Sequence, residues 1–508
     1  MSAPLDQAPP SPTSLETADQ ERADAAQLAS LGYRQRLTRS LGLFSNFAVG
    51  FTYLSPLVGV YSLFGYGLAT GGPAFFWTIP IVMAGQLLVL LTFAEIASQY
   101  PIAGGVFQWA KRLIGPRYAW FSGWMYVWAL LVTTASIAFP VATYAGPLLG
   151  FNPTYWTTVI TALIVIAVTT TVNLFGTRVL AFAARIGVGV EILGTVVLGL
   201  YLLLFHHHEP AGSIFHTAGA TSSGGGYFGA FLAAALFAVW IFYGFEACGD
   251  IAEEVKDPSR KIPRAMWMTL GVGGLATVVL TLGLTYAVPS FGDVISGKDA
   301  NPVNTVLDAD LGSGGSKIAL ALIVLGYASC TLAIQAAATR LVYSFGRDGV
   351  IAGGRALARL HPRLHMPLGA IAVTGLIPAV IVFLPSATVD RIITFAVVGI
   401  YVGFQCVVLA AVVARARGWR PAGSFTLGRL GWWVNIGGLV YGVTAIVVLS
   451  WKTPPLGSSF FDRWLVPISV GIIAVAGLLY LLLARPKENI AAEDRAADTA
   501  TAGAGASA

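Results

Sequence analysis

The chain of 508 residues is 56% hydrophobic and only 11% charged, with a formal net charge of +6. Soluble domains carry about 25% charged residues, so this composition excludes an ordinary soluble protein and indicates a polytopic membrane protein. The positive charge does not indicate a nucleic-acid binder, because the basic residues are scattered between apolar segments and report membrane orientation. The three cysteines lie far apart in apolar segments, so we expect neither a metal site nor a cofactor.

Both ends of the chain are polar. Residues 1–40 are rich in alanine, serine, proline and charge, and they lack the early apolar stretch of a signal peptide. We therefore expect a disordered cytoplasmic tail over 1–40, a membrane domain over 41–486 and a second disordered cytoplasmic tail over 487–508.

Twelve apolar segments are long enough to cross a bilayer, which takes about 20 residues each. They cover residues 43–67, 73–98, 117–145, 154–175, 179–205, 226–256, 262–288, 317–347, 368–385, 391–414, 432–451 and 464–484. On the side opposite to the termini, the loops hold only five of the 30 basic residues, namely Lys298, Lys317, Arg391, Lys452 and Arg463. The positive-inside rule therefore predicts cytoplasmic termini, in a multi-pass protein of the cell (plasma or inner) membrane.

The first span carries a helix-breaking signal in its middle. Pro56 removes a backbone donor and clashes with the preceding turn, and Gly50 and Gly59 lie on either side of it. Tyr53 and Ser55 add polar groups at the same point. An ordinary proline kink is the alternative, because membrane helices tolerate such kinks.

The sixth span has a matching interruption. Here Glu246 lies between Gly244 and Gly249, although a carboxylate in a membrane helix costs about 2.5–3.5 kcal/mol. A helix that breaks at this depth must line a cavity or be buried in protein. Interrupted spans in corresponding positions indicate a solute site at the breaks of two five-helix repeats, over about 43–205 and 226–414, with residues 432–484 outside them.

Three segments resemble hallmark motifs of one transporter family. They read AEIASQYPIAGGVFQWAKRLIGP at 94–116, AEEVKDPSRKIPRA at 252–265 and RLVYSFGRDG at 340–349. All three resemble permeases of the amino acid–polyamine–organocation (APC) superfamily, and the chain is most similar to the amino acid/choline/GABA permease branch. The resemblance implies an all-α membrane protein of 12 transmembrane helices, with the LeuT-type 5+5 inverted repeat, broken helices 1 and 6, and helices 11–12 outside the repeat.

The resemblance also implies a secondary active transporter, an amino acid permease. We expect proton-coupled symport of an amino acid or related small amine by alternating access. An exchanger and a non-transporting membrane sensor are the alternatives. We expect no enzymatic activity, because the sequence has no P-loop and no Ser-His-Asp or metalloprotease pattern. The expected partners are the small-molecule substrate, H+ and the lipid bilayer, without nucleic acid.

The first-span break departs from the family pattern. The family commonly has a G-S-G-type break, where bare amides bind a carboxylate, whereas this chain reads YLSPLVG at 53–59. Proline removes one donor there, and side chains crowd the place of a carboxylate. A GABA-like, ethanolamine or choline-like substrate is therefore favoured over an ordinary α-amino acid.

Aromatic residues are expected to surround the substrate. The resemblance places Trp240 as the ring that closes over the solute and Tyr126 as a residue facing the same cavity, with packing as the alternative role for both. Phe242 and Tyr243 would extend this lining, which attracts an ammonium by about 0.5–2 kcal/mol per ring. The candidate substrate-binding residues are Tyr53, Ser55, Pro56, Gly59, Tyr126, Trp240, Phe242, Tyr243, Gly244 and Glu246.

Two intramembrane acids are the candidates for proton coupling. Glu246 either pairs with the substrate ammonium or binds the coupled proton, and its structural alternative is to hydrogen-bond the ends of the broken helix. Glu191 lies in span five, which in this fold passes the second cation site, so the resemblance implies a coupling acid. An ion pair with Arg185 or Arg178 is the alternative for Glu191.

Charged residues of the cytoplasmic loops could form gating ion pairs, and ordinary loop architecture with surface pairs is the alternative that we favour. Such pairs are worth about 0–1 kcal/mol, so none of these residues is assigned to the site. They are Glu95, Arg112, Glu253, Glu254, Arg260 and Arg347.

Overall fold

The computed structural model describes residues 12–221, 226–384, 389–452 and 460–486, which form helices and no strand. The first half contains α1 (Pro12–Ser30), α2 (Leu43–Leu54), α3 (Pro56–Gly71), α4 (Thr78–Gln99), α5 (Gly105–Leu113), α6 (Pro116–Ala138), α7 (Val141–Leu149), α8 (Tyr155–Leu174), α9 (Thr177–Glu191) and α10 (Leu198–Phe205). The second half contains α11 (Tyr227–Ala234), α12 (Leu236–Ile241), α13 (Ala247–Asp250), α14 (Pro258–Ala287), α15 (Phe291–Ile295), α16 (Pro302–Arg347), α17 (Gly354–Ala358), α18 (Leu368–Ile381), α19 (Val389–Ala416), α20 (Gly431–Lys452) and α21 (Phe460–Ala484).

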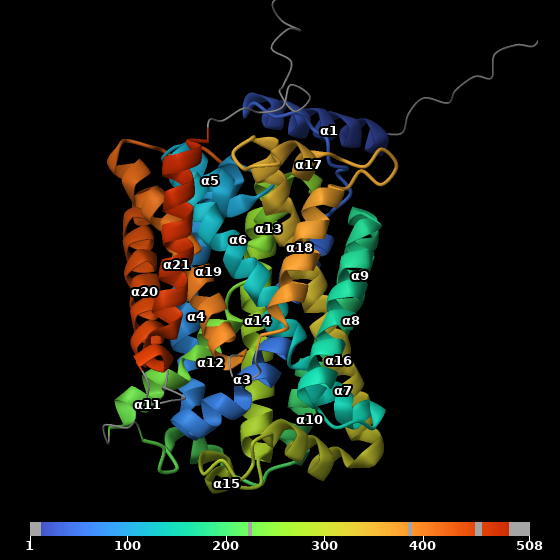
Figure 1. Ribbon diagram of the computed structural model, residues 1–508, viewed down its shortest axis with the longest axis vertical. Coiled ribbons are helices and arrows are strands. Elements are labelled where there is room, and N and C mark those ends of the chain that lie inside the picture. The colour runs from blue at the N-terminus through green and yellow to red at the C-terminus, as the bar shows by residue number, and fades with distance from the viewer. Residues whose placement is uncertain (1–11, 222–225, 385–388, 453–459, 487–508) are drawn as a thin grey trace, which may run out of the picture.

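The long helices run side by side as a bundle, with α1, α5 and α17 at one end and α11 and α15 at the other (Figure 1). Ten helical segments in the described ranges are long and apolar enough to cross a membrane, and each overlaps a predicted span. The predicted sixth and ninth spans contain shorter apolar helices, Tyr227–Ile241 and Leu368–Ile381. The protein is therefore a polytopic, multi-pass membrane protein.

The first span lies at the centre of this bundle. In its most apolar stretch 94% of the residues are buried, against 28% in the span that contains α20 and 11% in α21. The helices α20 and α21 accordingly lie together at the edge of the bundle (Figure 1). Their long exposed apolar faces are typical of helices that contact lipid.

The N-terminal region is ordered where we predicted disorder. Helix α1 lies across one end of the bundle (Figure 1), and Leu28 and Tyr33 are completely or almost completely buried. The backbone N–H groups of Ser40 and Leu41 donate to the carbonyl of Glu254 at 3.0 and 2.9 Å. The prediction of a disordered tail is wrong for residues 12–40, because a short polar segment folds when it covers buried groups of the domain. Residues 1–11 and 487–508 lie outside the described residues.

Candidate functional site

The first span breaks at Ser55, between α2 and α3. Ser55 has φ 42° and ψ 83°, a left-handed conformation that is uncommon for residues other than glycine. The following Pro56 explains the break, because its ring disfavours helical geometry in the residue before it. The Ser55 hydroxyl accepts from the Val58 N–H at 3.1 Å and thereby caps α3. Pro56 and Ser55 therefore act together to start the second half-helix.

The sixth span breaks between Ile241 and Ala247, and the two breaks touch. Gly244 has φ 115°, and a Cβ added there would lie 2.6 Å from the Leu54 nitrogen. A Cβ added to Gly59 would lie 2.5 Å from Ile241. Both glycines are thus required for the close approach of the two broken helices.

Glu246 lies at the centre of this junction and is completely buried. Its carboxylate accepts from the Gly244 N–H at 2.7 Å and from the Tyr126 hydroxyl at 3.0 Å. Gly244 therefore serves the site twice, through its conformation and through its amide. The predicted proximity of Tyr126 and Glu246 is present in the structure, whereas their roles in transport stay predictions.

Asp250 is a second buried acid that sequence reasoning left out of the site. Its Oδ2 lies 3.4 Å from the same Tyr126 hydroxyl, and its Oδ1 is buried with no hydrogen-bond partner among the described residues. In the chain as far as the structure describes it, neither Glu246 nor Asp250 forms an ion pair with a basic side chain. The i, i+4 spacing of the two acids was a usable signal, because it places both on one helix face.

Three aromatic residues close over this junction. The Tyr53 and Tyr243 rings lie 6.2 Å apart at 87°, and the Trp240 and Tyr243 rings lie 5.8 Å apart at 80°. All three side chains are buried, and among the residues that the structure describes the Tyr53 hydroxyl has no hydrogen-bond partner. These are edge-to-face arrangements, which aromatic pairs prefer.

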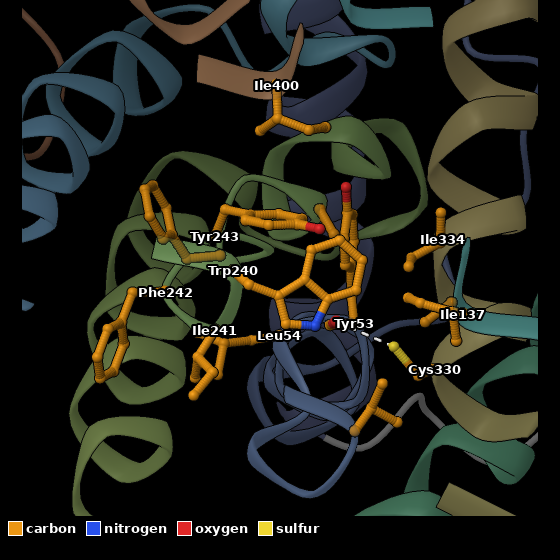
Figure 2. Packing of buried hydrophobic residues seen from close by; sticks show 14 of the residues in the cluster. Tyr53, Leu54, Ile137, Trp240, Ile241, Phe242, Tyr243, Cys330, Ile334 and Ile400 are labelled. Atoms are coloured by element: carbon orange, nitrogen blue, oxygen red, sulfur yellow. Dashed lines mark hydrogen bonds between the residues drawn. The ribbon is translucent and has the colours of Figure 1, made fainter. Parts of the chain in front are cut away.

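The aromatic residues enclose a cavity of only about 10 Å³. Figure 2 shows Trp240 beside Tyr53, facing Cys330 and Ile137 across this small space. Phe242 follows the last residue of α12 and points away from this space (Figure 2), so it does not line the cavity in this conformation, and its role in substrate binding stays a prediction. About 10 Å³ holds one water molecule, so the helices must separate before a solute can enter.

Glu191 binds the first-span break from the side. One carboxylate oxygen accepts from the Ser55 hydroxyl, and the other accepts from the Leu57 N–H at 3.0 Å. The alternative of an ion pair with Arg185 or Arg178 is wrong, because Glu191 forms no ion pair in the described chain and Arg185 donates to a backbone carbonyl. A carboxylate is stabilised at a helix N-terminus, so Glu191 takes the position at α3 that would suit a bound carboxylate.

The backbone directly after Glu191 is a π-helical segment, η2 (Ile192–Val197). Such segments are rare in proteins overall, and those that occur are often found at functional sites. They change the direction of side chains and leave a backbone carbonyl without its helical partner. The Gly194 carbonyl freed here accepts from the Tyr61 hydroxyl at 2.8 Å, which ties span five to α3. The sequence showed an acid in this span, whereas only the helix geometry shows that the acid turns toward Ser55.

Buried ion pairs close the bundle on the side of the termini. Arg347 lies 2.7 Å from Glu253, Arg340 contacts both oxygens of Glu254, and Lys111 lies 2.6 Å from Asp348. Arg415 pairs with Glu95 in the same end of the molecule. The prediction of surface pairs is wrong for Glu95, Glu253, Glu254 and Arg347, whose side chains are buried, while Arg260 is exposed as expected.

Tyr33 explains much of this burial. Its hydroxyl lies 3.0 Å from Asp348 and 3.1 Å from Gln108, and the Arg347 guanidinium lies 4.1 Å from its ring centre. Burial raises the pKa of Tyr33, so its hydroxyl is a neutral hydrogen-bond donor at physiological pH. The N-terminal segment thus seals the ion pairs from solvent.

Two discontinuous helices that meet over buried acids, beneath a layer of buried ion pairs, are typical of a membrane transporter. The amino acid permease family matches residues 41–482, and the chain belongs to this family. The expected resemblance to APC permeases is thereby confirmed.

Similar proteins are named as transporters of amino acids, choline or polyamines. The chain is 25% identical to the amino-acid permease BAT1 of Arabidopsis thaliana, over 90% of this chain and 94% of that protein. It is 24% identical to a choline transporter of Saccharomyces cerevisiae, over 83% of this chain and 77% of the relative. It is 22% identical to a putative polyamine transporter of Candida albicans, over 93% and 90% of the two chains.

Proposed function

We propose that this permease is a proton-coupled uptake transporter for a small organic amine, working by alternating access at the plasma or inner membrane with cytoplasmic termini. The fold proposed with it has twelve spans, ten long helices plus the two shorter apolar ones, arranged as two inverted five-helix repeats followed by α20 and α21. The contact between the breaks in spans one and six supports this arrangement, because equivalent elements of two repeats would meet at the substrate site.

The observation that carries the proposal is the pair of buried acids. Glu246 and Asp250 share the single proton of the Tyr126 hydroxyl and have no basic partner in the described chain. Two uncompensated carboxylates in a buried site are costly, so the site favours either a proton or an organic cation. Proton coupling results if the proton and the organic cation replace each other at these two carboxylates. Tyr53, Tyr243 and Trp240 supply ring faces that suit an ammonium.

The position of Glu191 favours an amine over an α-amino acid as the substrate. Because this carboxylate already accepts from Leu57 N–H and Ser55, a substrate carboxylate has no free donor and meets a like charge at α3. The choline and polyamine names among the relatives agree with a cationic substrate. Exchange of one solute for another remains the second candidate, since the same site serves both modes.

The direct test is uptake by purified protein in liposomes. Radiolabelled choline, ethanolamine, putrescine, GABA and α-amino acids are each offered with an imposed inward proton gradient. We expect accumulation of an amine that a protonophore abolishes. Accumulation that requires sodium would contradict proton coupling, and efflux that requires external substrate would identify an exchanger.

A thermal-shift screen gives a prediction independent of transport. Ligands that bind only the native state raise stability by about 2.7 kcal/mol at one hundred times their Kd, which corresponds to a few degrees in Tm. We expect this shift from a small amine and none from the α-amino acids. A shift from an α-amino acid with none from amines would contradict the proposed substrate class.

Replacing Glu191 by alanine should change the substrate preference. The substitution frees the Leu57 N–H and Ser55 for a substrate carboxylate, whose placement at a partly buried helix N-terminus is worth up to about 2 kcal/mol. We expect the preference for ethanolamine over GABA, measured as competing inhibition constants, to fall about tenfold.

Two further measurements make this result specific. Thr195→Ala, in the same span, removes a hydroxyl that within the described chain donates to the Glu191 backbone carbonyl alone, so the preference of this variant should stay that of the wild type. If Glu191 is instead the coupling acid, the alanine variant keeps its preference and loses proton dependence.

A further inference from the structure

A cavity of about 670 Å³ opens in the loop between α19 and α20, and none of its lining residues belongs to the transport site. Its lining includes three arginines, Arg415, Arg420 and Arg429, two tryptophans, Trp419 and Trp432, and no acidic residue. The loop lies at the end of the molecule that also carries α1, α5 and α17 (Figure 1). The volume is within the range of about 300–1,000 Å³ that is usual for small-molecule sites.

The inner wall of this cavity is held in place. Arg415 pairs with Glu95, and its guanidinium lies 5.6 Å from the Trp419 ring centre. The Trp419 indole N–H donates to the Tyr100 hydroxyl at 3.2 Å, and the Leu427 N–H donates to Glu95 at 2.7 Å. These contacts fix the shape of the inner wall.

The outer wall carries unneutralised positive charge. Arg420 and Arg429 are exposed, and within the described chain neither has an ion pair or a side-chain hydrogen bond. Arg415 is neutralised by Glu95, so the cavity has a net charge of about two. Guanidinium groups bind phosphate oxygens in pairs of hydrogen bonds, which makes a phosphate the matching ligand.

The surroundings place this charge at the surface of the bilayer. Trp432 and Trp433 are 40% and 74% exposed at the start of α20, and Leu430 before them is 67% exposed. Tryptophans in such positions mark the headgroup level of a membrane. The exposed apolar length of α20 continues from there into the hydrocarbon region, where acyl chains would lie.

We propose that this cavity binds the phosphate headgroup of an anionic phospholipid, with Arg420 and Arg429 as the phosphate ligands and Trp432 at the glycerol level. The lipid would hold the loop against α4. Two hydrogen bonds already join them: the Ala422 N–H donates to the Gln99 side chain, and the Ser98 hydroxyl donates to the Phe425 carbonyl. The site is separate from the transport site, so it stands whether or not the proposed substrate class is correct.

The test compares wild type with Arg420→Gln/Arg429→Gln and with the control Arg417→Gln. Arg417 is an exposed arginine of the same loop that does not line the cavity. Each protein is reconstituted in phosphatidylcholine with a minor fraction of phosphatidylglycerol, and native mass spectrometry counts the lipids that stay bound. A basic residue near an anionic lipid surface is worth about 1 kcal/mol, so each lost guanidinium should reduce the phosphatidylglycerol preference about fivefold.

We expect the double variant to lose this preference about twentyfold and Arg417→Gln to retain it. An unchanged preference in the double variant, or an equal loss in the control, would overturn the proposal. Inorganic phosphate is added to detergent-solubilised protein as a separate arm. If inorganic phosphate alone raises the melting temperature of the wild type as much as phosphatidylglycerol does, the ligand is a soluble phosphate and the lipid assignment is overturned. Should the double variant misfold, each single variant is expected to show the fivefold loss.

Discussion

Glu246→Gln is expected to abolish proton-driven uptake while the protein stays folded. Glutamine preserves the shape of the side chain: its amide oxygen can still accept from the Gly244 N–H, and its NH2 group can donate to the Tyr126 hydroxyl oxygen. It cannot carry the negative charge that a proton or an ammonium would neutralise. Losing a buried charge partner costs about 2–5 kcal/mol, so we expect the initial uptake rate to fall about thirtyfold or more.

Counterflow separates the two roles of Glu246. In this assay the variant exchanges labelled for unlabelled substrate without a proton gradient. Retained counterflow with lost accumulation would identify Glu246 as the proton site, and loss of both would identify it as the ammonium partner. Normal accumulation by the variant would exclude either role.

Glu21→Gln is the matched control for this prediction. Glu21 lies in α1 with a half-exposed side chain and a long contact of 3.4 Å to Lys256. Exposed pairs of this kind are worth about 0–1 kcal/mol, so uptake should be unchanged. Asp250→Asn completes the set, because it tests whether the second acid shares the function of Glu246.

Arg347→Ala is expected to open the bundle on the side of the termini. The substitution leaves Glu253 buried without its partner at 2.7 Å and removes a cation from the Tyr33 ring. Breaking a buried ion pair in this way costs about 3–5 kcal/mol. The closed conformation carries this cost, so an open conformation that hydrates Glu253 becomes more populated.

The native cysteine Cys330 reports this opening. It is buried against the central cavity, where its sulfur lies 3.3 Å from the Tyr53 carbonyl. We expect a thiol reagent to label Cys330 at least about tenfold faster in Arg347→Ala than in wild type, as resolved by peptide mass spectrometry. An unchanged rate would show that the Arg347–Glu253 pair does not hold the closed state.

A double variant distinguishes opening from general loss of stability. Arg347→Met with Glu253→Leu removes both charges, and replacing a buried pair by apolar residues is often neutral or stabilising. Its melting temperature should therefore exceed that of Arg347→Ala. If both variants melt alike, the loss comes from packing around Tyr33 rather than from the unpaired carboxylate.

Local sequence signals located the membrane helices and both breaks. Spans follow from stretches of about 20 apolar residues, a requirement that acts on each segment separately. The first break follows from Pro56, whose effect on Ser55 is purely local. The second follows from the rarity of an acid such as Glu246 beside Gly244 in an apolar span.

Long-range pairing was beyond these signals. The sequence left Glu191 between a coupling acid and an arginine pair, and packing turned it toward Ser55, 136 positions away in the chain. Glu253 and Arg347 were expected at the surface but are buried, and residues before the first span fold over them, with the Tyr33 ring against Arg347 and its hydroxyl at Asp348. Neither contact produces a periodic pattern or a characteristic residue spacing that could be recognised in a single sequence.

The sequence by itself determined that this is a many-helix membrane protein of the APC type with two interrupted spans and a buried acid, because hydropathy, proline and glycine act on neighbouring residues. Only the tertiary structure decided what each buried charge faces: Asp250 beside Tyr126, Glu191 at the start of α3, and Glu253 against Arg347. The physical reason is that the cost of a buried charge depends on the partners that packing brings to it.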